Sequence, residues 1–113
     1  MKNLKFLSPK EEKAVKEFCK SLRTKYKKRV KFIRIFGSKV HGKSDKFSDI
    51  DIFILLDKKD KRIGDYISRA AWERSLKYDV VLSPIVYEER LFRRPVIQIT
   101  PFIKNVLKEG AMI

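Results

Sequence analysis

The chain has 113 residues, and its 28 Lys and Arg against 14 Asp and Glu give a formal net charge of +14. Domains commonly run to about 100–150 residues, so we expect one domain over residues 1–113, with no second lobe. With 43% hydrophobic residues, the chain can bury a core, which excludes a wholly disordered protein.

The sequence also argues against several cellular settings. Its one cysteine, Cys19, excludes an internal disulfide and a cysteine-based zinc site. The longest apolar run, residues 52–56, is far shorter than the about 20 residues of a membrane span. With no secretory signal in residues 1–9, we expect a cytoplasmic protein. Side-chain amides are scarce, which indicates a thermophilic source; they are Asn3, Gln98 and Asn105.

The positive charge is concentrated in residues 20–43. No acidic residue lies between Glu17 and Asp45. Such a block attracts polyanions, either nucleoside triphosphates or nucleic acid. A solvated helix face followed by a turn is the alternative interpretation. The basic residues are Lys20, Arg23, Lys25, Lys27, Lys28, Arg29, Lys31, Arg34, Lys39 and Lys43.

Capping signals and apolar periodicity predict the elements. Ser8, Pro9 and Glu11 form a helix start, and apolar residues spaced by three and four then predict a helix over 9–28. Tyr26 and Phe32 are interpreted as core residues. Two strands follow, and then a helix over 62–77 that places Trp72 on or near its apolar face. A third strand, a short edge strand and a last helix that stops at Gly110 complete the order. The predicted strands cover 30–36, 50–56, 79–86 and 96–99, and the last helix begins at Thr100-Pro101. This order predicts an α/β (α+β) fold, a small mixed β-sheet flanked by helices.

One segment carries chemistry: Gly37-Ser38, ten residues, and then Asp49-Ile50-Asp51. Glycine lets a backbone approach closely, and a serine with the following amides can bind a phosphate oxygen at a helix start. The two aspartates lie two apart on a strand, so both point to one face about 7 Å apart along the backbone. Carboxylates at this spacing can converge on divalent cations that bridge a triphosphate.

A purely structural interpretation competes at both aspartates. Asp49 at a strand entry can simply cap a turn with Ser48. Asp51 lies inside the strand, where an unpaired buried carboxylate costs several kcal/mol unless a cation or donor meets it. We therefore favour a functional role for both.

The spacing of Gly-Ser and Asp-x-Asp resembles the signature of the DNA polymerase β-like nucleotidyltransferases. Residues 36–44 leading to 48–52 are similar to the minimal nucleotidyltransferases of prokaryotes, single small domains often paired with a HEPN-domain protein in a toxin–antitoxin system. The resemblance implies a polymerase β palm-like fold and covers most of the chain, from the leading helix to Glu109-Gly110.

The resemblance also implies roles for individual residues. Gly37 and Ser38 would cradle the β,γ-phosphates of ATP, the substrate. Asp49 and Asp51 would hold two Mg²⁺ ions. Asp79 is the candidate for the family's third carboxylate, which binds the metal nearest the attacking hydroxyl and helps to accept its proton. A turn residue between helix and strand is the alternative for Asp79.

Several polar residues near these motifs have weaker assignments. Lys39 and Lys43 lie in the connecting loop and are expected to help neutralise the triphosphate. His41 has no His or Cys cluster near it in the sequence, so it is a poor metal ligand and a phosphate-side donor or simple loop residue. Glu88 and Glu89 are rival acids, but their charged surroundings favour a solvated surface.

Three functions remain open. The favoured one transfers a nucleoside monophosphate, AMP in the sharpest version, to a hydroxyl; the resemblance suggests a tyrosine of a HEPN-domain toxin. A partner or a second copy would complete the site. The second is a catalytically silent module of the same fold that neutralises a partner or binds RNA through residues 20–43. The third, a basic nucleic-acid-binding protein, leaves Asp49 and Asp51 unexplained.

Overall fold

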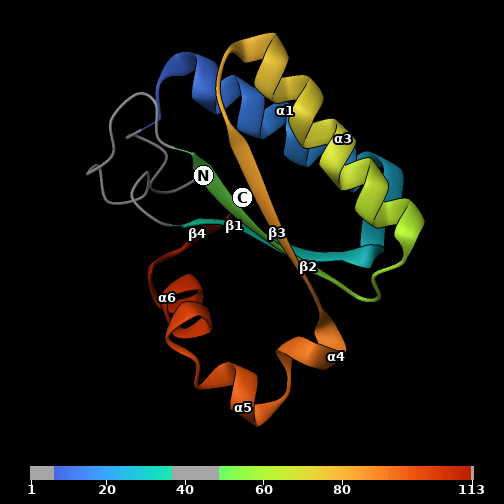
Figure 1. Ribbon diagram of the computed structural model, residues 1–113, viewed down its shortest axis with the longest axis vertical. Helices are drawn as coiled ribbons and strands as arrows, with labels where there is room; N and C mark the ends of the chain where they lie inside the picture. The colour runs from blue at the N-terminus through green and yellow to red at the C-terminus, as the bar shows by residue number, and fades with distance from the viewer. Residues whose placement is uncertain (1–6, 37–48, 113) are drawn as a thin grey trace.

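The computed structural model describes residues 7–36 and 49–112. The helices and strands follow one another in the order that the sequence pattern predicts, up to the end of the third strand (Figure 1). They are α1 (Pro9–Tyr26), a 3₁₀ turn η1 (Lys27–Arg29), β1 (Val30–Phe36), β2 (Ile50–Leu56), α3 (Lys61–Tyr78), β3 (Leu82–Glu88), α4 (Glu89–Phe92), α5 (Pro95–Gln98), α6 (Pro101–Glu109) and β4 (Ala111–Met112).

The described strands form one mixed sheet in the order β3-β2-β1-β4. β2 runs antiparallel to β1 and parallel to β3, whereas the short β4 pairs antiparallel with β1. The central strand β2 therefore has a hydrogen-bonded neighbour on each side. Its sequence is almost continuously apolar, as expected for a strand covered on both faces.

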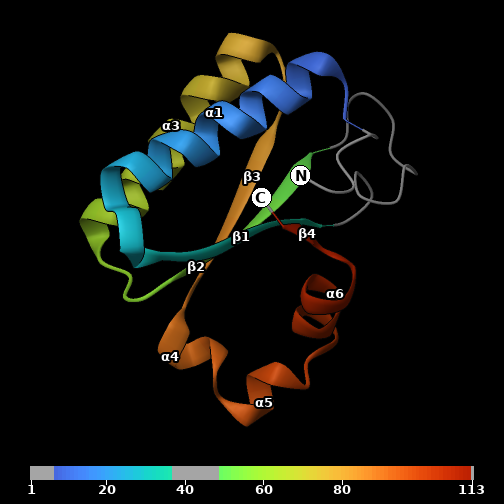
Figure 2. The ribbon, with the colours of Figure 1, turned by 180° about the vertical axis from the view of Figure 1, so that it is seen from behind.

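Helices cover the two faces of the sheet unequally. Figures 1 and 2 show α1 and α3 on one face, and α4, α5 and α6 on the other. Ile50, Ile52 and Ile54 of β2 belong to the core under α1 and α3, whereas Phe53 and Leu55 belong to the second core under α4 to α6. The alternation of β2 therefore assigns each residue to one of two cores.

The capping signals predicted for the first and the last helix are both confirmed. The Glu11 amide donates to Ser8 Oγ at 3.2 Å, and the Ser8 amide donates to Glu11 Oε1 at 2.8 Å, which is a complete capping box. The Ile103 amide donates to Thr100 Oγ1 at 3.4 Å at the start of α6. None of the helices in the described ranges is both long and apolar enough to cross a membrane.

Three local predictions are wrong. The third strand begins at Leu82 rather than at residue 79, because Asp79 ends α3 in the left-handed conformation (φ 54°, ψ 52°). It continues to Glu88 through Pro84, which an edge strand tolerates. Residues 96–99 hold most of α5 instead of an edge strand, since Pro95 occupies a first helical position and starts a turn of helix. Trp72 is 63% exposed, because it lies on the outer side of α3.

Phe53 is expected to be the most costly residue to truncate in the second core. Its fully buried ring lies 5.3–6.2 Å between centroids from four other rings; they are those of Phe32, Tyr87, Phe92 and Phe102. Phe53→Ala should lower the free energy of unfolding by about 3–5 kcal/mol in urea titrations. The exposed Leu76→Ala should change it by less than about 0.5 kcal/mol. Equal effects would contradict this packing.

Candidate functional site

Asp49 and Asp51 lie where β2 enters the sheet. Asp51 is half-buried and lies between Phe36 of β1 and Ser83 of β3 in the strand register. Asp49, which is exposed, directly precedes the strand. Strand alternation places both carboxylates on the sheet face of Phe53, the face that α4 to α6 cover further along. The pair therefore lies at the start of the strand that is hydrogen-bonded to both β1 and β3.

The surroundings of Asp51 disfavour its charged form. Partial burial raises the pKa of Asp51, and the neighbouring negative charge of Asp49 raises it further. Desolvation and like-charge repulsion thus act in the same direction on one group. Within the described ranges, no hydrogen bond or ion pair to a protein cation offsets them.

This arrangement suits a divalent cation. Mg²⁺ is bound in proteins by one or two carboxylates, together with water and substrate phosphates. A cation between Asp49 and Asp51 would remove the repulsion that raises the Asp51 pKa. The donor set is therefore chemically appropriate for a metal that also carries a triphosphate.

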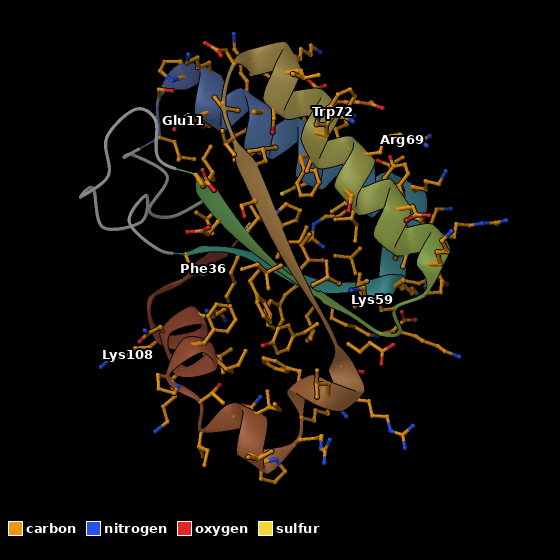
Figure 3. All side chains as sticks on the ribbon, viewed as in Figure 1. Glu11, Phe36, Lys59, Arg69, Trp72 and Lys108 are labelled. Atoms are coloured by element: carbon orange, nitrogen blue, oxygen red, sulfur yellow. The ribbon has the colours of Figure 1, made fainter. Side chains whose placement is uncertain are left out.

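Aromatic rings and one arginine support the face on which Asp51 lies. The Phe36 ring meets Phe102 of α6 edge-on, at 5.3 Å between centroids. Arg34 donates from Nη1 to the Leu107 carbonyl at 3.0 Å, and so ties β1 to the end of α6. Figure 3 shows Phe36 at the end of β1, above α6. These contacts were not predicted, although the alternation of Phe32, Arg34 and Phe36 along β1 indicates that the three side chains share one sheet face.

Asp79 is not brought together with this pair. Its carboxylate is fully exposed and lies 3.7 Å from Lys10 Nζ of α1. Its backbone is nevertheless close to the end of the sheet where Asp49 and Asp51 lie, because the Ile50 amide donates to the carbonyl of Val81 at 2.8 Å. Among residues 7–36 and 49–112, no three His, Cys, Asp or Glu side chains are grouped so as to hold a metal. The role of Asp79 as a third metal ligand stays a prediction.

The phosphate-binding half of the motif lies outside the described residues. This applies to Gly37, Ser38, Lys39, His41 and Lys43, which follow β1 in the chain. Their roles also stay predictions.

The two rival acids have structural partners. Glu88 Oε2 accepts from the Lys59 amide at 2.8 Å, and Glu89 pairs with Arg93 at 3.2 Å.

Burial raises the pKa of the Cys19 thiol to about 12, so this thiol is not a nucleophile at neutral pH.

The basic block separates into parts with different surroundings. Arg34 is half-buried and bonded to α6, and Arg29 pairs with Asp57 and Asp60 at 3.2 and 3.3 Å. The exposed cations of the block within the described residues lie on the second half of α1, on η1 and at the start of β1; they are Lys20, Arg23, Lys25, Lys27, Lys28 and Lys31.

The chain belongs to the nucleotidyltransferases. Residues 15–112 match the model of the nucleotidyltransferase domain family. The chain is also 41% identical over 103 residues to a protein of Methanocaldococcus jannaschii, covering 91% of this chain and 97% of the relative. A second protein of that organism is 36% identical over 81 residues, covering 68% and 79%. Both carry the provisional name of protein adenylyltransferase.

Solved structures share the fold at low sequence identity. Chains from the toxin–antitoxin MntA–HepT and from a toxin–antitoxin crystallised with AMP-PNP superpose with TM-scores of 0.53 and 0.57. The identities are 18% and 19%. The matches cover 89% and 84% of this chain, and 69% and 68% of theirs. The predicted mixed fold and the nucleotidyltransferase family are thus both confirmed.

Asp51→Asn should stabilise the free protein at neutral pH. Because the folded-state pKa of Asp51 is raised, its ionisation opposes folding once the pH exceeds the unfolded value of about 3.8. We expect melting by circular dichroism at pH 7 to show a gain of a few degrees. The gain should vanish near pH 3, where the carboxyl is protonated in both states.

The matched control is Asp65→Asn, which removes the same charge from an exposed position of α3. It should leave the melting temperature nearly unchanged at both pH values. A lower melting temperature for Asp51→Asn at pH 7 would show that the Asp51 carboxylate stabilises the fold.

Proposed function

We propose that this nucleotidyltransferase transfers AMP from ATP to a hydroxyl group of a partner protein. The observation that carries the proposal is the Asp49–Asp51 pair at the start of the central strand, where burial and the charge of Asp49 raise the pKa of Asp51 and no cation among the described residues offsets them. Family membership supports the reaction class, and the name of the 41% identical relative supports a protein acceptor. A cytoplasmic location, where ATP is abundant, fits this activity.

Asp49 and Asp51 would hold Mg²⁺, two ions in the full arrangement. Gly37 and Ser38 would bind the β- and γ-phosphates, and Lys39 and Lys43 would neutralise part of their charge. Bound Mg²⁺ would supply electrostatic stabilisation of the phosphate oxygens.

The reaction is a substitution at phosphorus. The acceptor hydroxyl oxygen forms a bond to the α-phosphorus, while the bond from that phosphorus to the bridging oxygen breaks and releases pyrophosphate. The hydroxyl proton passes to a carboxylate or to water. The protein's own contribution is to position the groups and to balance their charge.

Asp79 is proposed as the third carboxylate, next to the attacking hydroxyl. Its position near the edge where β2 and β3 begin supports this role. The role requires its carboxylate to leave Lys10, to which it is bound in the free chain. Exposed ion pairs contribute little stability, typically about 0–1 kcal/mol, so such a movement costs little.

A HEPN-domain toxin is the proposed acceptor. The solved structures of similar fold include toxin–antitoxin complexes, one of them with the ATP analogue AMP-PNP. The described residues form one sheet with its helices, and Asp49 and Asp51 lie at the end of that sheet where β2 and β3 begin. A partner protein that presents its own hydroxyl would complete such a site, as would a second copy of this chain.

One observation favours a second candidate, a catalytically silent module that neutralises a partner by contact. The carboxylate of Asp79 faces Lys10 and not Asp51. A silent module would bind its partner, and at most ATP, without forming a phosphodiester. Transfer of label from ATP therefore separates the two functions.

The test is incubation of the chain with a HEPN-domain protein encoded in the same genome, with Mg²⁺ and ATP labelled on either the α- or the γ-phosphate. We expect α-label, but no γ-label, on the partner. Asp49→Asn/Asp51→Asn and EDTA should each reduce transfer by more than about 100-fold, since even indirect support of a metal is worth 10–100-fold. Calorimetric titration should show MgATP binding lost in the same variant.

Asp65→Asn/Glu73→Gln is the matched control, because it neutralises two exposed carboxylates of α3. It should transfer label like the wild-type chain. Partner binding without transfer would support the silent module. MgATP binding that survives both EDTA and the Asp49→Asn/Asp51→Asn change would contradict the metal site.

A further inference from the structure

A cleft lies near the end of β2 opposite to the end that carries Asp51. It has a volume of about 490 Å³ and lies between the end of α1 and the start of α3. Residue Leu56, at the end of β2 next to this cleft, is about 16 Å along the strand from Asp51. The cleft is lined by Lys25, Tyr26, Lys61, Arg62, Asp65, Tyr66 and Arg69.

The charge of this cleft is strongly unbalanced. Four of its seven lining side chains are cations and one is a carboxylate. That carboxylate, Asp65, lies 4.0 Å from Lys61. In the part of the chain that the structure describes, no carboxylate lies within ion-pair distance of Arg62 or Arg69. Nearby Asp57 and Asp60 are engaged by Arg29. The cleft is therefore positive overall, with Asp65 as the one carboxylate among its lining residues.

Two tyrosines form the apolar part of the cleft. The rings of Tyr26 and Tyr66 meet edge-on at 5.4 Å, and Lys25 Nζ lies 4.8 Å from the centre of the Tyr66 ring. Both rings are half-buried, and both pack against the edge of the core under α1 and α3, as expected for Tyr26. The Tyr26 hydroxyl oxygen is buried and has no hydrogen-bond partner among the described residues. A ligand group or water in the cleft would satisfy it.

An exposed tryptophan lies on α3 next to the cleft. Arg62, Tyr66 and Arg69 follow one another at spacings of four and three, so they share one side of the helix, and Trp72 lies three residues beyond Arg69. Figure 3 shows Arg69 and Trp72 on the side of α3 away from the sheet. Trp72 is 63% exposed, although a tryptophan is among the residues that gain most from burial. Along the sequence, cations alternate here with aromatic rings over about three helical turns.

From this arrangement we infer that the cleft and the adjoining face of α3 bind single-stranded RNA. Phosphates would pair with Arg62, Arg69 and Lys25, while bases would stack on Tyr66 and Trp72. Proteins that bind single strands combine a positive groove with aromatic side chains in this way. An acidic protein surface would use the cations but would leave the two tyrosines and the tryptophan without a role. This binding is independent of the Asp49–Asp51 site.

The test measures fluorescence anisotropy of a labelled 12-nucleotide RNA in EDTA, with the full-length Asp49→Asn/Asp51→Asn variant as background. In EDTA that variant has no metal-dependent site, so failure of the proposed transferase function would not affect the result. Each phosphate contact contributes about 0.7 to the salt slope for single strands. Arg62→Ala/Arg69→Ala should therefore lower the slope by about 1.4 and weaken binding by 10-fold or more.

Substitution of Tyr66 and the intrinsic fluorescence of Trp72 test the stacking of bases directly. Tyr66→Leu should weaken RNA binding by about 5-fold or more, but should leave binding of inorganic polyphosphate unchanged. Trp72 is the one tryptophan of the chain, so its fluorescence should be quenched as RNA is added. Circular dichroism checks that the Tyr66 variant is folded. The Arg62→Ala/Arg69→Ala variant does not touch the core, because both arginines are exposed.

Lys104→Ala/Lys108→Ala on α6 is the matched control, because it removes the same charge elsewhere. The inference is overturned if this control loses as much affinity as the arginine pair, or if Trp72 emission does not change. It is also overturned if a 12-residue poly-glutamate peptide binds as tightly as RNA, since the cleft would then accept acidic protein. Displacement of RNA by equimolar ATP in EDTA would assign the cleft to a free nucleotide instead.

Discussion

The repulsion between two carboxylates at the start of a buried strand is the constraint on which this structure depends. Asp49 and Asp51 share one sheet face, and both partial burial and mutual repulsion raise the pKa of Asp51. The rest of the fold compensates for that cost. Strand β2 is held by β1 and β3, and it contributes to both hydrophobic cores. A strand anchored this firmly can keep two like charges together until a cation arrives.

The two ends of the sheet differ in their chemistry. One end presents carboxylates, and the other presents cations beside tyrosines. This separation matters for a chain with a net charge of +14, because a polyanion is attracted to the whole molecule. Carboxylates at one end discourage a phosphate ligand without a metal, whereas the cations of the cleft between α1 and α3 attract one. The two proposed anion sites, one that needs a metal and one that does not, would therefore lie at opposite ends of one small domain.

Much of the fold was predictable from the sequence, because local signals and long-range packing agree there. Strands 30–36 and 50–56 match the structure, and the capping box at Ser8 and Glu11 is formed. The errors occur where tertiary context overrides local preference. The β-branched residues in 96–99 lie in and after a short helix, and the apolar Trp72 lies on a solvent face that periodicity alone places near the core. At the site, strand alternation predicted the Asp49–Asp51 pair. The alternative interpretation of Asp79, a turn residue between helix and strand, is confirmed, since Asp79 ends α3. Its ion pair with Lys10 was not predicted, because the exact end of a helix is poorly determined by local sequence.

The most direct measurement is crystallographic: anomalous diffraction from this chain with Mn²⁺ and AMP-PNP, collected at the manganese edge. Manganese takes the place of magnesium and is located by its own signal. We expect an anomalous peak within about 2.5 Å of carboxylate oxygens of both Asp49 and Asp51, in contact with the triphosphate. A nucleotide bound without metal at this edge, or manganese bound away from both aspartates, would contradict a metal-binding role for the pair.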